Sequence, residues 1–233
     1  MSTGKANPNV SNQASTVSRI LFNGDYAAAD EGSYFTSWMA ATANTAVAVT
    51  TQALGTTSPV LVVFNGNPAG SGYNVYMRTV KFRITAAQTG LTTVEHVGVL
   101  NGSNVTHTTI PATGMSAPVN VNGSSNNSSK TLLYGGVNVT MTPGQLARIV
   151  HTGPVAGIIP IVLDSWIFNY GGPSMFGNMQ EAVTTTKILT IALPPVIIAP
   201  QQYYTLGLWG ASMAATAATY RMDVGFIERP SGL

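Results

Sequence analysis

The segment YMRTVKFRIT, residues 76–85, decides the fold, because apolar and polar side chains alternate along it. A period of two is typical of a β-strand, in which successive side chains point to opposite faces. One face is predicted to be buried and carries Tyr76, Val80, Phe82 and Ile84, while the polar face carries Thr79, Lys81, Arg83 and Thr85. Arg78 falls on the apolar face and is the exception to the pattern.

The same alternation recurs along the chain, at residues 137–141, 189–193, 204–208 and 220–226. Val60–Phe64 is continuously apolar, which fits a strand buried on both faces. Further candidate strands are residues 17–22, 47–51, 92–100, 105–110, 146–152 and 158–163. Turn signals from 24 Gly and 13 Pro fall between the candidates. This pattern predicts an all-β fold, an antiparallel β-sandwich of the jelly-roll type.

Helical signals are weak. Ala-rich stretches at 27–29 and 211–218 are short, and one or two helical turns are expected in residues 33–43, around Trp38.

Two polar segments stand apart from the strand pattern. Residues 1–16 have no periodicity and are expected to form an extended N-terminal arm. Residues 119–130, VNVNGSSNNSSK, have low complexity and are expected to form a long loop. Such a loop could link two small β-domains, but neither half has a complete core of its own. We therefore predict a single β-sandwich domain at 17–233.

The chain is poor in charge. Only 8% of its 233 residues are charged, against about 25% in an average globular protein. The net charge of +2 provides no extended basic surface for nucleic acid. No apolar run reaches the roughly 18 residues of a membrane-spanning helix. Because there is no Cys, disulfides, thiolate metal sites and Cys nucleophiles are excluded. We expect neither a nucleic-acid partner nor a membrane partner.

The histidines provide a weak metal-site candidate. His96 and His107 could meet across a hairpin and bind a metal, while the alternative is a set of edge-strand histidines in a Thr-rich sheet. Phosphate-loop, H-E-x-x-H and G-x-S-x-G motifs do not occur.

The carboxylates do not form a recognisable site either. Asp25, Asp30 and Glu31 cluster in sequence but match no standard calcium loop. Asp164 and Glu181 could act as a glycosidase pair, yet no sequence feature links them. We predict no catalytic, cofactor-binding or metal-binding residues and no cofactor, and therefore no enzyme.

Basic and aromatic residues leave two alternatives open. Arg78, Lys81 and Arg83 form the densest basic group, which suits either solvated strand positions or a contact with an acidic protein surface. Trp38, Trp166 and Trp209 could form a carbohydrate platform, although such residues more often pack in cores or anchor interfaces.

Two stretches carry a resemblance. Residues 60–85, VLVVFNGNPAGSGYNVYMRTVKFRIT, combine a buried strand, an N-P-A-G-S-G turn and a long alternating strand. Residues 194–210, PPVIIAPQQYYTLGLWG, and residues 220–230, YRMDVGFIERP, are similar in style. Over about residues 58–85 and 187–230 the chain resembles β-sandwich virion proteins of tailed bacteriophages, including jelly-roll head-decoration (cement) proteins. One departure is Gln201-Gln202 after Pro200, where a Pro-Gly turn is expected.

The resemblance implies a non-enzymatic virion structural protein, most of all a decoration protein on the capsid surface. Such a protein would form a homo-oligomer, expected to be a trimer, and would bind the major capsid protein or other virion proteins. Expected contact residues lie in the arm, at Asn7, Pro8, Asn9 and Val10, and in the loop, at Asn122, Ser124, Asn126 and Asn127. Alternatives are the shell-forming capsid protein of a small virus, or a receptor- or glycan-binding module of a tail or fibre.

Overall fold

The computed structural model describes residues 24–39, 45–46, 60–86, 94–101, 114–135, 147–152, 162, 164–171, 179–183, 186–210 and 219–231. The predicted N-terminal arm at 1–16, with its contact residues Asn7–Val10, lies outside these residues. So do the candidate strands 17–22, 47–51, 105–110, 137–141 and, except for Val162, 158–163, together with the Ala-rich stretch 211–218.

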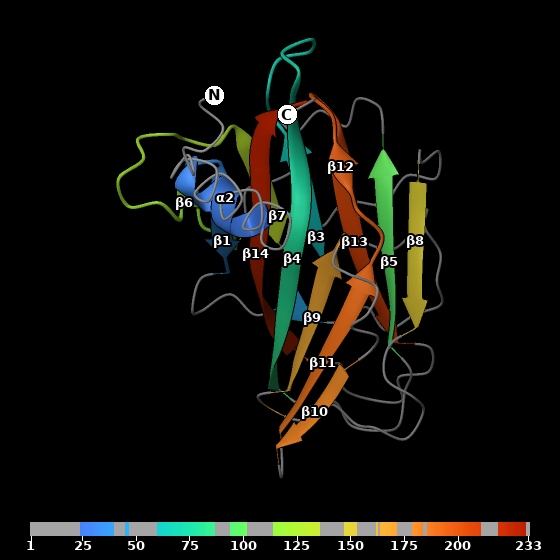
Figure 1. The fold of residues 1–233 in the computed structure, drawn as a ribbon. Coiled ribbons are helices and arrows are strands. Elements are labelled where there is room, and N and C mark those ends of the chain that lie inside the picture. Colours follow the sequence, from blue (N-terminus) through green and yellow to red (C-terminus); the bar gives the residue numbers. More distant parts are fainter. Residues whose placement is uncertain are drawn as a thin grey trace, which may run out of the picture.

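The described strands form two sheets (Figure 1). The large sheet has the order β10 (Met179–Val183), β11 (Thr186–Leu193), β9 (Ser165–Tyr170), β4 (Tyr73–Ala86), β14 (Thr219–Pro230), β1 (Tyr34–Trp38) and β6 (Val119–Asn120). In addition, β12 (Ile197–Ile198) pairs with β4, and β2 (Thr45–Ala46) pairs with β14. The small sheet has the order β7 (Thr131–Gly135), β3 (Leu61–Asn65), β13 (Tyr203–Gly210), β5 (Val94–Asn101) and β8 (Ala147–Thr152).

The pairing confirms the predicted antiparallel β-sandwich. Neighbouring strands run antiparallel except β9 and β11, which are parallel. Jelly-roll connectivity and a single domain at 17–233 stay predictions. The short helix α2 (Gly24–Asp30) precedes β1, and no helix in the described residues is long and apolar enough to span a membrane.

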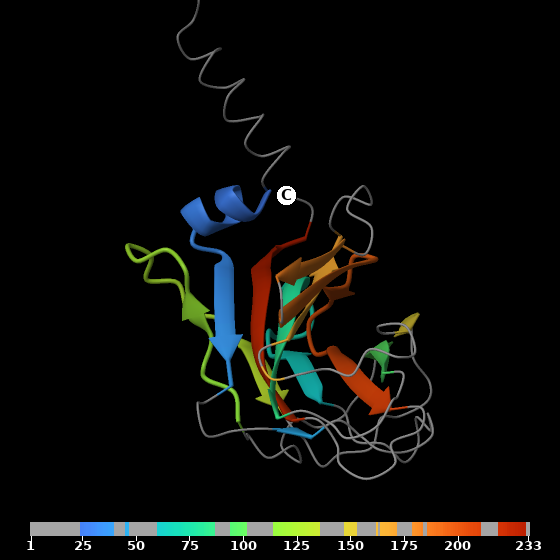
Figure 2. The same ribbon diagram turned by 90° about the horizontal axis from the view of Figure 1, so that it is seen from below.

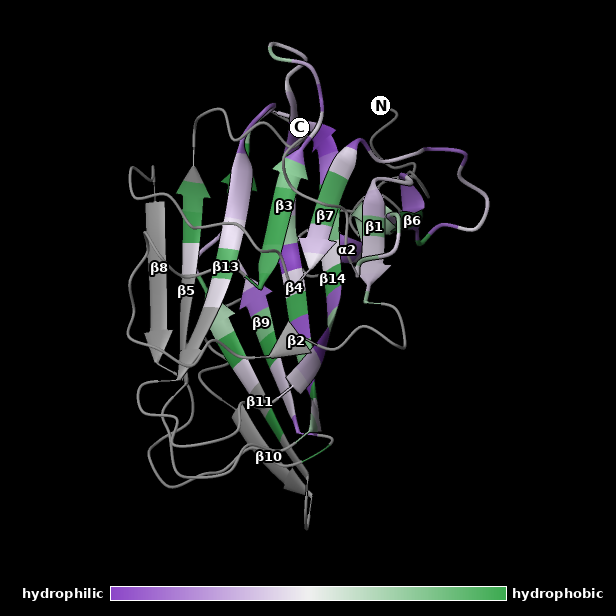
Figure 3. Cartoon of the chain, turned by 180° about the vertical axis from the view of Figure 1, so that it is seen from behind, coloured by the Kyte–Doolittle hydropathy of each residue, from purple (hydrophilic) through white to green (hydrophobic). Residues whose placement is uncertain are grey.

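One hydrophobic core lies between the two sheets. The large sheet contributes the inward side chains of β4, β9 and β14, and the small sheet contributes Leu61, Val63, Leu133, Tyr204 and Leu206. Figure 2 shows the sheets as two layers, and Figure 3 shows β3 hydrophobic along most of its length. β3 is buried at every position, as its continuous apolar run predicts. The alternating residues Tyr220, Met222, Val224 and Phe226 are likewise all buried.

Strand β4 departs from the predicted alternation at Arg78. Its partner residues in β14 pass from Gly225, opposite Thr79, directly to Phe226, opposite Met77, so Arg78 is an extra residue. Such a bulge switches the face on which the preceding residues lie. Val75 and Met77 are therefore buried, and the prediction that Tyr76 shares the face of Val80 is wrong. The bulge also releases Arg78 from the apolar face, and its guanidinium pairs with Asp25 of α2.

Residues 34–38 form strand β1 and not the helical turns expected around Trp38. Phe35 and Ser37 are buried, while Trp38 is 45% exposed. Pairing with β14 along the whole length of β1 overrides the weak helical signal of this segment. Trp166 is a core residue, 3% exposed, and the burial of Trp209 lies outside the described features.

A tyrosine pair joins the two sheets. The hydroxyls of Tyr170 in β9 and Tyr204 in β13 are 3.1 Å apart, and their rings meet edge to face at 5.8 Å. Burial raises the pKa of Tyr170, Tyr204 and Tyr220 above the ordinary value of 10.0. All three phenols therefore stay neutral in the folded protein at a pH where the unfolded chain begins to ionise.

We predict that the free energy of unfolding falls as the pH rises above 10. Below pH 10 the phenols are protonated in both states, whereas above it only the unfolded chain releases their protons. Each buried tyrosine should account for a loss of about 1.4 kcal/mol between pH 8 and pH 11. Urea unfolding at the two pH values measures this loss of stability. In a Tyr220→Phe variant the loss between pH 8 and pH 11 should be smaller by about 1.4 kcal/mol. Equal stability at pH 8 and pH 11 would contradict the prediction.

A second prediction concerns the two kinds of buried hydroxyl. In the described part of the chain, the Tyr220 hydroxyl is buried without a hydrogen-bond partner. Tyr220→Phe at pH 7 should leave the free energy of unfolding unchanged or raise it by about 1 kcal/mol. Tyr204→Phe should lower it by about 1–2 kcal/mol, because the Tyr170 hydroxyl loses its partner. Chemical denaturation of both variants checks the contrast, and a greater loss for Tyr220→Phe would refute it.

Candidate functional site

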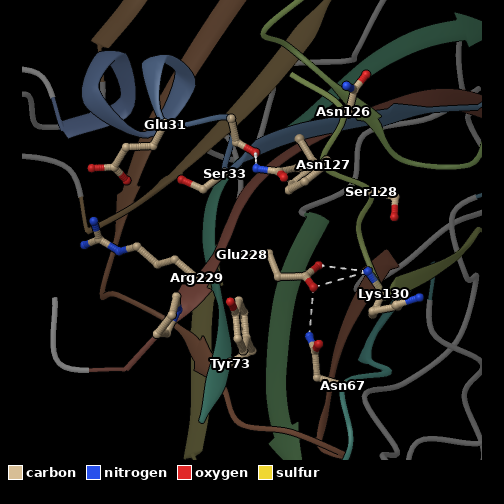
Figure 4. A pocket seen from close by; sticks show the side chains of 13 residues that line it. Glu31, Ser33, Asn67, Tyr73, Asn126, Asn127, Ser128, Lys130, Glu228 and Arg229 are labelled. Atoms are coloured by element: carbon tan, nitrogen blue, oxygen red, sulfur yellow. Dashed lines mark hydrogen bonds between the residues drawn. The ribbon is translucent and has the colours of Figure 1, made fainter. Parts of the chain in front are cut away.

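The most developed polar site is an open pocket of about 510 Å³ at one end of the sandwich (Figure 4). We call it the Glu228 pocket. It lies between the start of β1, the turn before β4, the loop after β6 and the end of β14. Its lining residues are Glu31, Gly32, Ser33, Phe35, Asn67, Tyr73, Asn126, Asn127, Ser128, Lys130, Glu228, Arg229 and Pro230. Its volume lies within the roughly 300–1,000 Å³ of small-molecule sites.

The carboxylate of Glu228 is buried, with 8% of the residue exposed. Oε1 accepts a hydrogen bond of 2.8 Å from Asn67 Nδ2. Oε2 accepts bonds of 2.5 Å from Ser129 Oγ and 2.8 Å from Thr131 Oγ1. The backbone N–H of Lys130 lies 3.2 Å from both oxygens. Since a carboxylate has about four acceptor sites, these donors occupy it. Glu228 is therefore an anchor for the chain and has no free lone pair with which to act as a general base.

The Asn67 donor is itself fixed by a second buried amide. Asn65 Oδ1 accepts bonds from Asn67 N and from Asn67 Nδ2, and Asn65 Nδ2 donates to the carbonyls of Tyr73 and Ile198. Gly70 and Gly72 adopt positive φ between these residues, which allows the chain to reverse into β4. The N-P-A-G-S-G turn thus places an amide directly below the Glu228 carboxylate.

Gln201 supports the same turn from the other side. Its φ is +63°, in the left-handed region that favours glycine, at the place where the resemblance leads one to expect a Pro-Gly turn. Its backbone N–H donates to the Asn65 carbonyl at 2.9 Å, and its Nε2 donates to the Asn67 carbonyl at 2.7 Å. The two bonds compensate for the unfavourable backbone conformation of a non-glycine residue.

The loop predicted at 119–130 begins only after Val119–Asn120, because these two residues pair with β1 as strand β6, and the rest of it has a defined conformation. After β6, Asn122 Nδ2 donates to the Asp30 carbonyl, and Asn122 Oδ1 accepts from the backbone and the hydroxyl of Ser124. Asn127 Nδ2 donates to the Gly32 carbonyl. Ser124, Asn126 and Asn127 are exposed, and Asn122 is partly buried. The four loop residues expected to make contacts therefore lie on one hydrogen-bonded segment, and two of them line the Glu228 pocket.

Three charged side chains line the rim of the pocket. Glu31 and Arg229 lie on one side, and Lys130 lies on the other (Figure 4). The Arg229 guanidinium lies over the Tyr76 ring, 5.4 Å from its centroid. Its Nε is buried and has no hydrogen-bond partner in the described part of the chain. The rim can thus donate and accept hydrogen bonds to a polar ligand or to a neighbouring protein.

The three acidic residues that cluster in the sequence have three different environments in the structure. Asp25 pairs with Arg78, the Asp30 carbonyl holds Asn122, and Glu31 lines the pocket. Among the described side chains, no three metal-ligating residues gather into a possible metal site.

The strand register rearranges the other candidate pairs. His96 of β5 lies opposite His151 of β8, whereas His107 is outside the described residues. Glu181 lies opposite Ile188, and Ile188 lies opposite Ser165, the neighbour of Asp164. Strand β11 therefore separates Glu181 from β9, so two strand spacings of about 4.8 Å lie between them.

Comparison with family models, curated proteins and solved structures finds no match for this chain. The functional assignment therefore depends on the residues of the chain itself.

Glu228→Gln should lower the free energy of unfolding by about 3 kcal/mol, because an amide NH₂ would face donors and strand at least one of them. The matched control is Glu31→Gln at the exposed rim, which should change stability by less than about 0.5 kcal/mol. Urea unfolding measures both, and amide exchange at Lys130 should accelerate only in Glu228→Gln. If Glu228→Gln is as stable as the control, the carboxylate is not the anchor.

Proposed function

We propose that this chain is a non-enzymatic structural protein of a virion, of the capsid-decoration type, which works by binding other protein chains. The observation that carries the proposal is a preformed, uncharged surface made of edge strand β6 and the loop residues 121–129. We call it the β6-loop surface. The low charge of the whole chain and its resemblance to phage decoration proteins support the same reading.

The β6-loop surface combines exposed apolar and amide side chains. Val119 and Val121 are 48% and 44% exposed, and they flank Asn120 at the edge of the large sheet. Ser124, Asn126 and Asn127 continue the surface without a charge. Protein interfaces have cores depleted in charge, since charge is costly to desolvate. The composition of this surface therefore suits contact with another protein.

The rigidity of the loop favours binding. A flexible loop loses conformational entropy when a partner orders it, and this loss weakens affinity. Here Glu228 holds Ser129, Lys130 and Thr131 at the base of the loop, while Gly32 and Asp30 hold its middle. The loop therefore loses much of its conformational entropy when the chain folds, and it has less to lose when a partner binds.

A decoration protein occupies repeated positions on a symmetric shell, and a homotrimer suits a threefold position. The major capsid protein, or another virion protein, is the proposed partner, and the capsid surface is the proposed location. Neither nucleic acid nor a membrane is a proposed partner, and no cofactor is needed.

Native mass spectrometry of the purified chain tests the association. The wild type should form a homo-oligomer, most of all a trimer. Val121→Arg should weaken the association of the subunits by at least about ten-fold, because a charge would enter the contact. Ile197→Arg is the matched control: Ile197 is also an exposed apolar residue, at 46%, but lies on β12. In purified particles of the virus that encodes the chain, several hundred copies on the head are expected. A monomer that is absent from such particles would overturn the proposal.

A further inference from the structure

A second hollow lies on the outward face of the large sheet, away from the Glu228 pocket. It has a volume of about 460 Å³ and is lined chiefly by outward-facing residues of β1, β4, β9 and β14. The strand register explains the set, because paired residues share a face. Trp38, Asp223, Lys81 and Ile167 form one row across β1, β14, β4 and β9, and Thr36, Gly225 and Thr79 form the next. We call the hollow the Trp38 groove.

Gly225 makes the groove possible. A Cβ at this position would lie 2.7 Å from both Tyr34 Oη and Thr79 Oγ1, too close for a side chain to fit without displacing them. Tyr34 reaches across Gly225 to hydrogen-bond Thr79, and burial together with the negative charge of Asp25 raises its pKa. The phenol of Tyr34 therefore stays neutral and occupies the space that a side chain at position 225 would need.

Trp38 is a large apolar side chain held at the surface. It is 45% exposed, although the adjacent Ser37 and Met39 are buried. Its backbone is fixed, because Trp38 N donates to Ser116 Oγ at 3.1 Å and Trp38 O accepts from Ser116 N at 2.8 Å. The indole is thus attached to a rigid strand and offers an aromatic surface to a ligand.

Two opposite charges lie beside the indole and do not form an ion pair with each other. Lys81 and Asp223 are direct partners across β4 and β14, yet the ion pair described in this structure is the one between Arg78 and Asp25. Within the described residues, neither Lys81 nor Asp223 is engaged in a side-chain hydrogen bond or an ion pair. One ammonium donor and one carboxylate acceptor therefore remain available next to an aromatic ring, with no net charge between them.

We propose that the Trp38 groove binds a neutral pyranose unit of an oligosaccharide. The apolar C–H face of such a ring packs on the indole, while its hydroxyls need both donors and acceptors at the ring edge. Asp223 accepts hydrogen bonds from neighbouring hydroxyls, and Lys81 and Thr36 donate to ring or hydroxyl oxygens. An anionic ligand would be attracted by Lys81 and repelled by Asp223, so the pair offers it no net electrostatic attraction. A purely apolar ligand would cover both charges without satisfying them. A glycan satisfies all three features.

The test uses the full-length chain on a printed array of neutral and anionic oligosaccharides, followed by calorimetric titration with the strongest hit. The expected hit is a neutral glycan. Trp38→Ala should weaken its binding by at least about ten-fold, through loss of the stacked aromatic surface. Asp223→Asn should also weaken it by about ten-fold, since one charge-assisted acceptor is lost. Thermal unfolding confirms that both variants fold.

Tyr73→Ala is the matched control. Tyr73 is an exposed aromatic of similar exposure, 43%, but it lines the Glu228 pocket. It should leave the affinity unchanged. The proposal fails if no glycan binds, if the hits are anionic glycans, or if Tyr73→Ala abolishes binding while Trp38→Ala does not. A chain that still oligomerises but binds no glycan counts against this proposal alone, so the structural role at the β6-loop surface is judged separately.

Discussion

The pairing of β4 with β14 is the constraint on which the rest of the structure depends. These two strands occupy the middle of the large sheet, and together they contribute to the core, to the Glu228 pocket and to the Trp38 groove. β4 has two more residues than β14, and the excess is absorbed at Arg78 and Thr85. Without the bulge at Arg78, a long strand in perfect register would turn a guanidinium into the core. With it, the same guanidinium reaches Asp25 and the apolar residues on both sides of the bulge face inward.

Hydrophobic patterning is sufficient to predict individual strands: alternation predicts the strand at 220–226, and a continuous apolar run predicts the buried strand at Val60–Phe64. Alternation fails at Tyr76, because a bulge depends on pairing with the partner strand, and its one local sign is Arg78 on the apolar face. It fails again at Trp38, where weak local preferences are outweighed by pairing with a strand that begins more than 180 residues later. Periodicity therefore describes individual strands well but says little about register.

The hydrogen bonds around Glu228 are not predictable from the sequence for a related physical reason. Glu228 bonds to Asn67 across 161 positions and to Ser129 across 99, and no spacing rule connects such residues. The low-complexity composition of residues 119–130 suggested a loop, and its exposed Asn and Ser side chains agree with that. The loop is ordered because hydrogen bonds hold its base to Glu228 and its middle to the carbonyls of Asp30 and Gly32. Gln201 is a similar case, since its left-handed conformation depends on carbonyls supplied by the turn at Asn65–Asn67.

The Glu228 anchor also defines which positions are interchangeable. The carboxylate contacts position 130 through the backbone N–H alone, but it contacts positions 129 and 131 through hydroxyls. The side chain at 130 is thus free to vary, whereas its two neighbours must each supply an O–H donor. A chain built on the same plan would carry a hydroxyl residue, any residue and a second hydroxyl residue, with the second hydroxyl residue opening a strand of the small sheet, and a glutamate near the end of its last strand. This sparse signature is defined by donors and not by overall similarity, so it can identify distant relatives that share few other residues.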